Sequence, residues 1–183
     1  MALTVIKNNA LSKQASDFIY YQENQKQFRA KVKQFEQALK QECIDTKQED
    51  NLPSLQGYEE GFVKHGFADG QYIRTITMPE GLVISTKIHK QNHPFFVMKG
   101  ECSVYSETGM QKIKAPFHGI TEAGTKRLLY IHEECVWITV HCTDKLTLAE
   151  VEEECIAKDF EEVGFIGVDT KQIDKLIEQV RNR

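Results

Sequence analysis

Residues 81–100 read GLVISTKIHKQNHPFFVMKG, and the rest of the sequence is understood most easily from this segment. It places His89 and His93 four residues apart, between Gly81 and Gly100, among β-branched, aromatic and polar side chains. Runs of this kind between glycines are typical of short β-strands joined by turns. The segment therefore predicts a strand pair with two imidazoles, which either bind a ligand or form hydrogen bonds at a strand bend.

Strand signals continue on both sides of this segment. Alternating and β-branched runs separated by turn residues predict strands at residues 72–78, 82–89, 95–98, 102–107, 110–114, 126–131 and 135–141. No helical periodicity interrupts the series. Several short strands in close succession predict an antiparallel sandwich or a small barrel.

The N-terminal part of the chain has a different pattern. Residues 16–43 contain no Gly or Pro and are rich in Gln, Lys, Glu and Ala, which predicts one long helix with Ser16 or Asp17 as its N-cap. Its apolar stripe has coiled-coil spacing and consists of Tyr21, Gln25, Phe28, Val32, Phe35 and Leu39. Such a stripe packs either along its own domain or against another chain. Both alternatives stay open, and we expect a homo-oligomer formed through the barrel and this helix.

The C-terminal part returns to helical patterns. Residues 44–57 are polar and contain Pro and Gly, which predicts a linker after the first helix. Residues 146–156 predict a short acidic helix, and Asp169 or Thr170 begins a further helix with an apolar face. We therefore expect a β-rich body flanked by helices.

Length and composition suit one globular domain with appendages. Of the 183 residues, 40% are hydrophobic and 27% charged, and the formal net charge of -4 gives no general attraction to nucleic acid or anionic membranes. No apolar run approaches the roughly 20 residues that span a bilayer, and the N-terminus lacks the apolar core of a signal peptide. Five cysteines without CxxC spacing argue against a disulfide framework. We expect a cytoplasmic protein with no nucleic-acid or membrane partner.

The β-rich part of the chain resembles the cupin superfamily. The first cupin motif has a glycine, a His-x-His pair, a glutamate and a second glycine at fixed spacings. Gly81, His89 and Gly100 keep these spacings, whereas Lys87 stands at the place of the first histidine and His93 at that of the glutamate. The resemblance implies a mainly β, cupin-type jelly-roll barrel with a long N-terminal helix and C-terminal helices.

This resemblance divides the chain into three parts. Residues 1–57 form an N-terminal helical arm and linker, residues 58–143 the cupin-like barrel, and residues 144–183 a C-terminal helical extension. Residues 115–141, APFHGITEAGTKRLLYIHEECVWITVH, also resemble uncharacterised cupin-like proteins of tailed phages. A phage origin would place the protein in the cytoplasm of the host cell.

The second cupin motif, which normally provides a further histidine, is degenerate here. Residues 122–127 read EAGTKR and put Arg127 at the position of that histidine. In the family, three histidines and one glutamate hold a transition metal. Lys87 and Arg127 have no lone pair to donate at neutral pH, and their charges repel a divalent ion. These two residues therefore argue against a metal at this place, and no cofactor is predicted.

A divalent transition metal remains the fallback. Its candidate ligands are His89 and His93, which alone make a weak pair. A third imidazole would have to come from His118, His132 or His141.

The same positions favour an anion. If the motif brings them together, a basic cavity is formed by Lys87, His89, His93, Arg127 and His141. Arginine binds carboxylates and phosphates bidentately, and lysine adds a point charge. We therefore predict a non-enzymatic binding or accessory protein whose ligand is an anionic small molecule, either phosphorylated, nucleotide-like or carboxylated.

Two other classes of function stay open. The chain can be a cupin enzyme, either metal-dependent with an unusual ligand set or a metal-free sugar-nucleotide isomerase or epimerase. In the metal-free case His89 or His93 would act as the base and Tyr105 or Tyr130 as the acid. The other class is a scaffold or virion-associated structural protein.

Overall fold

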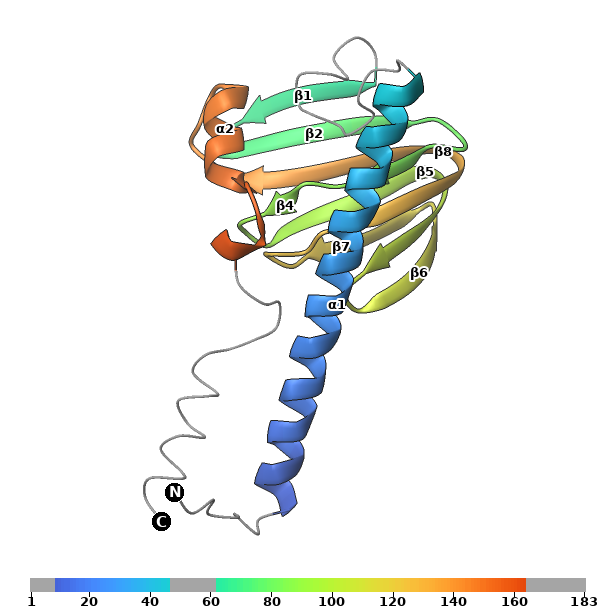
Figure 1. The fold of residues 1–183 in the computed structure, drawn as a ribbon. Coiled ribbons are helices and arrows are strands. Elements are labelled where there is room, and N and C mark those ends of the chain that lie inside the picture. The colour runs from blue at the N-terminus through green and yellow to red at the C-terminus, as the bar shows by residue number, and fades with distance from the viewer. Residues whose placement is uncertain (1–8, 47–61, 164–183) are drawn as a thin grey trace.

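The structure, a computed structural model, describes residues 9–46 and 62–163 (Figure 1). It is mainly β, with antiparallel strands, a long helix at the N-terminal side and a short helix after the last long strand. This confirms the fold class expected from the sequence, and the antiparallel sheets are consistent with a cupin-type jelly roll. The helix expected after Asp169 or Thr170 lies outside the described residues.

Within the described residues, seven strands form one sheet and two form another. The strands are β1 (Val63–Ala68), β2 (Gln71–Met78), β3 (Val83–Ser85), β4 (Ile88–His89), β5 (His93–Ser106), β6 (Gly109–Lys114), β7 (Phe117–Thr121), β8 (Leu128–Cys142) and β9 (Ile156–Ala157). The large sheet has the order β1-β2-β8-β5-β6, with β3 also paired to β8 and β7 to β5, and all these pairs are antiparallel. β4 pairs with β9 in the small sheet. The long strands β5 and β8 therefore carry most of the large sheet.

β5 and β8 are longer than the sequence predicts. β5 joins the strands expected at 95–98 and 102–107, and β8 joins those expected at 126–131 and 135–141. The sequence does not predict β1 and β7, which read VKHGFA and FHGIT. Each contains a glycine, which interrupts the alternating pattern by which a strand is recognised.

Gly100 allows β5 to continue as one strand. The register of β5 against β8 shifts between Val97 and Cys102. In the middle of this bulged stretch Gly100 has a φ of 85°. A Cβ at this position would lie 2.2 Å from the carbonyl oxygen of Glu134 on β8. Both the backbone conformation and the close approach of β8 therefore require glycine.

We expect Gly100→Ala to lower the free energy of unfolding by more than about 2 kcal/mol, because it adds a steric clash to left-handed backbone strain. Gly81→Ala is the matched control, since Gly81 has a φ of 80° and a Cβ added there would have no atom within 4 Å. Its expected loss is about 1 kcal/mol. Urea unfolding of the two variants measures the difference, and equal losses would show that β8 does not constrain Gly100.

The inward side chains of the long strands change from apolar to polar toward one end. On β5, the inward residue next to Phe95 toward this end is His93. On β8, the inward residues beyond Trp137 are Thr139 and His141. The rings of Phe95 and Trp137 stack with centroids 4.6 Å apart. The apolar core consists of Val63, Ile76, Met78, Ile84, Phe95, Val97, Cys102, Val104, Ile113, Leu129, Ile131, Cys135 and Trp137. The polar inward residues thus lie at the end of a packed apolar core.

Helix α1 (Asn9–Thr46) packs along the barrel and is longer than the predicted helix at both ends. Gln25 and Val32 are fully buried. The guanidinium of Arg29 pairs with the buried carboxylate of Glu107 at an N–O distance of 2.7 Å and lies 4.4 Å from the ring centroid of Phe160. This part of the apolar stripe therefore covers the barrel of its own chain. The N-terminal part of α1 extends beyond the barrel (Figure 1), and pairing with another chain stays a prediction.

A second set of contacts fixes α1 at the edge of the sheet. The carboxylate of Glu36 accepts a hydrogen bond from the hydroxyl of Ser85 on β3, at 2.8 Å. It also pairs with the ammonium of Lys126, at 2.6 Å. Lys126 precedes Arg127 in the loop between β7 and β8, so α1 braces the loop that carries this arginine.

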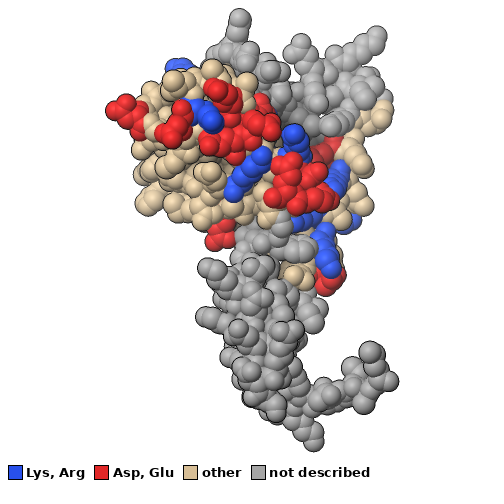
Figure 2. All heavy atoms as spheres, turned by 90° about the vertical axis from the view of Figure 1, so that its left-hand side faces the viewer, with Lys and Arg blue, Asp and Glu red and all other residues tan. Residues whose placement is uncertain are grey.

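Helix α2 (Leu148–Cys155) covers one end of the barrel and lies within the predicted 146–156 segment. The hydroxyl oxygen of Thr147 caps it by accepting from the backbone N–H of Glu150. Val151 and Cys155 pack against Tyr72 of β2. Figure 2 shows that acidic side chains, with a few lysines between them, gather on the face where α2 lies. The outside of this end is therefore largely acidic.

The described cysteines are all free thiols, as the sequence predicts. Cys102, Cys135 and Cys155 are buried and Cys142 is exposed. Among the described helices, none has the length and apolar character needed to cross a membrane.

Candidate metal and ligand site

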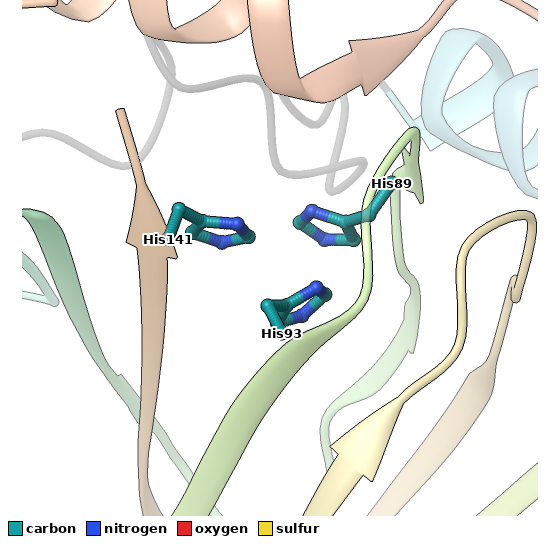
Figure 3. A group of neighbouring side chains, drawn as sticks. All are labelled: His89, His93 and His141. Carbon is teal, nitrogen blue, oxygen red and sulfur yellow. The ribbon is translucent and has the colours of Figure 1, made fainter. Parts of the chain in front are cut away.

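Three histidines from separate strands meet at the polar end of the barrel. His89 ends β4, His93 begins β5 and His141 lies near the end of β8. Their ring centroids are 4.2 Å apart for His89 and His93, 4.2 Å for His93 and His141, and 4.9 Å for His89 and His141. One possible ligand atom from each ring lies within 4.8 Å of the other two. Figure 3 shows the three rings pointing toward one another.

Backbone and side-chain hydrogen bonds hold the turn between His89 and His93. The carbonyl of His89 accepts from the N–H of Gly124 at 2.8 Å. The side-chain oxygen of Asn92 accepts from the N–H of Ala123 at 2.7 Å. Hydrogen bonds from the loop after β7 thus hold the turn between β4 and β5. The pairing of β4 with β9 holds the strand that carries His89.

Burial keeps the three imidazoles neutral. The exposed fractions of His93 and His141 are 3% and 4%. Burial, together with nearby Arg127, lowers the pKa of His93 to about 4, and burial with His93 and Arg74 nearby lowers the pKa of His141 to about 4. The pKa of His89 is lowered well below its usual value, first by burial and then by the other two histidines. At neutral pH each ring therefore has a nitrogen lone pair available.

The hydrogen bonds of the rings leave nitrogen atoms open. The Nδ1–H of His93 donates to the backbone carbonyl of Gln91 at 3.2 Å, which leaves the lone pair on Nε2. The Nδ1 of His89 is buried and has no hydrogen-bond partner in the described part of the chain. A carbonyl that orients a ring while its second nitrogen faces a cavity is the usual arrangement around metal-binding histidines.

All five residues expected at the site line one cavity of about 90 Å³. Arg127 enters it from the loop before β8. Its Nη1 donates to the hydroxyl of Thr121 at 2.7 Å, and its guanidinium lies 4.9 Å from the ring centroid of Phe95. Burial lowers the pKa of Arg127 to about 10, so it is still cationic at neutral pH. Thr125 and Arg127 also line a neighbouring cavity of about 410 Å³ beside β6 and β7.

The charge of Lys87 is balanced at the rim of this cavity. Its ammonium pairs with the carboxylate of Glu152 on α2, and the side chains are 29% and 35% exposed. The sequence had predicted two uncompensated cations, Lys87 and Arg127. Because α2 lies outside the segment that resembles cupins, the cupin motifs alone do not reveal the partner of Lys87.

Of the three candidates for a third imidazole, His141 joins the pair. His118 is exposed on β7. His132 forms a 2.8 Å hydrogen bond with Ser103 and follows Ile131, which points into the core. Strand alternation turns His132 away from the core for this reason. His65 lies on β1, and its Nδ1 is 2.7 Å from the hydroxyl of Tyr72.

Two polar residues of the cavity, Arg74 and Thr139, were not among those predicted from the sequence. Arg74 lies on β2 between the inward residues Tyr72 and Ile76, and burial lowers its pKa. Its Nε and the hydroxyl oxygen of Thr139 are buried with no hydrogen-bond partner among the described residues. The sequence could have identified Arg74 as an inward residue, because the alternation of the predicted strand 72–78 places Arg74 on the same face as Tyr72.

Comparisons with known proteins give structural matches only. No protein-family model matches the sequence, and no curated protein matches it. The chain is similar to a cupin-2 domain protein from Shewanella frigidimarina, with 11% identity over 44% of this chain and 78% of that chain and a TM-score of 0.38. A cupin superfamily protein from Desulfitobacterium hafniense has 12% identity over 51% and 96%, with a TM-score of 0.39.

An enzyme is also among the similar structures. An acetylacetone dioxygenase from Acinetobacter johnsonii has 17% identity over 44% of this chain and 58% of that chain, with a TM-score of 0.37. Other similar structures are described as proteins of unknown function. The comparisons lend no support to the resemblance to tailed-phage proteins.

The buried histidines predict a pH-dependent stability of the metal-free protein. Their pKa values lie below the usual 6.5, so the unfolded chain takes up protons first as the pH falls. The stabilising contribution is present above pH 6.5 and is lost between about 6.5 and 4, on the order of 3 kcal/mol for each of His93 and His141. Urea unfolding in the presence of a chelator at pH 7 and pH 4.5 measures this loss.

His141→Gln should reduce the difference in unfolding free energy between the two pH values, because glutamine does not titrate. His118→Gln, at an exposed position, is the matched control and should leave the difference unchanged. An unchanged pH dependence in His141→Gln would show that His141 is not held neutral by the fold.

Proposed function

We propose that the protein binds a divalent transition metal through His89, His93 and His141 and uses this centre to bind a small anionic molecule inside the barrel. The observation that supports it is the meeting of three neutral imidazoles, with ligand atoms within 4.8 Å of one another. The expectation of no metal rested on two uncompensated cations. Since Glu152 pairs with Lys87, one of these charges is already balanced.

The donor set suits a first-row transition metal. Imidazole nitrogen binds zinc, iron, nickel and copper, and the Nδ1 of His89 has no hydrogen bond to give up among the described residues. Nitrogens bound to one ion at about 2.1 Å lie roughly 3 to 3.5 Å apart. The separations between the ligand nitrogens, which are up to 4.8 Å, would therefore shorten by up to about 1.3 to 1.8 Å around an ion. A metal held by three neutral ligands supplies a Lewis-acid site with open coordination positions.

The residues around the histidines favour an anion as the further ligand. The cluster of three imidazoles includes no carboxylate, so nothing in it neutralises a divalent charge. Arg127 adds a positive charge to the same cavity. An anion that enters this space lowers the repulsion between these charges. Binding of a small molecule is therefore the function that we propose, and catalysis at the metal is an extension of it.

A metal-free isomerase or epimerase has less support. Tyr105 and Tyr130, the expected acids, are 44% and 42% exposed and belong to neither cavity. Tyr72 lines the inner cavity, but its hydroxyl is engaged by His65 and burial raises its pKa to about 12. A cytoplasmic setting, in which the free thiols stay reduced, and a homo-oligomeric state are part of the proposal.

Metal analysis tests the proposed centre. After incubation with Zn²⁺ and dialysis, we expect one zinc ion per chain by elemental analysis, and a raised melting temperature that a chelator reverses. His141→Ala should weaken zinc binding at least about 100-fold, because it removes one of three ligands. His118→Ala, on an exposed position of β7, is the control that should keep full zinc content. Equal zinc content in the two variants, or none in the wild type, would contradict the proposal.

A further inference from the structure

Arg74 has a half-buried side chain, and no acidic partner for it is found in the described part of the chain. It lines the inner cavity from β2. The Nε of its guanidinium is buried and has no hydrogen-bond partner among the described residues. A buried N–H donor without an acceptor destabilises a fold, because its hydrogen bonds to water are lost on folding and no protein acceptor replaces them. Such a group is expected where a ligand supplies the acceptor.

Thr139 provides a second open group next to Arg74. The two residues are direct cross-strand neighbours in the β2–β8 pair, and the adjacent inward pair is Tyr72 and His141. The hydroxyl of Thr139 is buried and has no hydrogen-bond partner among the described residues. The unpaired guanidinium Nε of Arg74 and the unpaired hydroxyl of Thr139 therefore belong to neighbouring residues, one inward position along the strands from His141.

The net positive charge of the cavity favours an anion as the ligand. Among the residues that line it, Glu152 is the one acidic side chain, and Lys87 pairs with it. Arg74 and Arg127 thus leave two positive charges beside three neutral imidazoles. A divalent metal adds two more. Buried charges of one sign repel strongly in a medium of low dielectric constant.

The size and the lining of the cavity restrict the anion. A volume of about 90 Å³ corresponds to the liquid volume of roughly three water molecules. Part of the wall is apolar and includes Ile76, Leu129 and Trp137. A carboxylate has two oxygens in one plane, which match one guanidinium. A short carbon chain fits the apolar wall better than the additional oxygens of a phosphate would.

We infer that Arg74, Thr139 and Arg127 form a binding site for the carboxylate of a small organic acid, in the cavity that contains the three histidines. The carboxylate site can be tested without metal, whereas its coupling to a metal rests on the proposed function. Where a metal is bound, the carboxylate reduces the positive charge around it. The two ligands therefore strengthen each other's binding by the same factor.

The chain contains its own reporter for this site. Its single tryptophan, Trp137, lines the cavity. Propionate is the probe, because it is a short monocarboxylate that hardly chelates free zinc, and propionamide is its uncharged counterpart. Titrations of metal-free and zinc-loaded protein are followed by Trp137 fluorescence, and zinc content is measured separately.

We expect metal-free protein to bind propionate but not propionamide, and zinc-loaded protein to bind propionate at least about tenfold more tightly. Arg74→Met should weaken propionate binding at least about tenfold while retaining one zinc ion per chain. Thr139→Val, which keeps the shape of the side chain, should weaken it several-fold. Lys64→Met, at an exposed position of β1, is the control and should change neither ligand.

The outcomes separate this inference from the proposed function. If propionate does not bind, binds equally well to Arg74→Met and Thr139→Val, or binds less tightly than inorganic phosphate, the carboxylate site is wrong, whether or not zinc binds. If zinc does not bind but propionate binds and depends on Arg74, the metal centre is wrong and the carboxylate site stands. Propionate affinity that is the same with and without zinc would overturn the coupling.

Discussion

The antiparallel pairing of β5 with β8 is the feature on which both the fold and the site depend. These two strands carry neighbouring strands on both sides, and their inward residues form much of the apolar core. The same pairing places His93 and His141 at one end of the barrel, where their rings approach to 4.2 Å. Gly100 allows the pairing to extend through an irregular stretch, because β8 leaves no room there for a side chain. The three histidines of the site thus lie on strands, whereas Lys87 and Arg127 lie in the segments between strands.

Charge is the property that connects the different parts of the site. Glu152 of α2 balances Lys87 at the rim, so the C-terminal segment contributes to the electrostatics of the barrel. Inside, Arg74 and Arg127 face neutral imidazoles without an acidic partner among the residues that line the cavity. Outside, the end covered by α2 is mostly acidic (Figure 2). The electrostatic potential inside the cavity is therefore set by these local charges rather than by the net charge of the chain.

The sequence was sufficient to predict the mainly β class, the long helix and the short acidic helix, because hydrophobic periodicity reports these elements directly. The five site residues named from the sequence, Lys87, His89, His93, Arg127 and His141, are among those that line the cavity, and the cupin motif spacing marks the first four of these positions. Their role in ligand binding stays a prediction. The sequence could not show which of His118, His132 and His141 meets the other two, because this depends on the register of β8 against β5. The sequence also could not reveal the ion pair between Lys87 and Glu152, because these residues are 65 positions apart.

Arg74 illustrates a different limit. Its inward position follows from the alternation on β2, but the lack of an acidic partner becomes visible only when the whole lining of the cavity is known. Crystallography of zinc-soaked protein at the zinc absorption edge would test the central idea most directly. We expect one anomalous peak, about 2.0 to 2.1 Å from a nitrogen of each of His89, His93 and His141. A peak elsewhere, or none between these three rings, would contradict the metal centre.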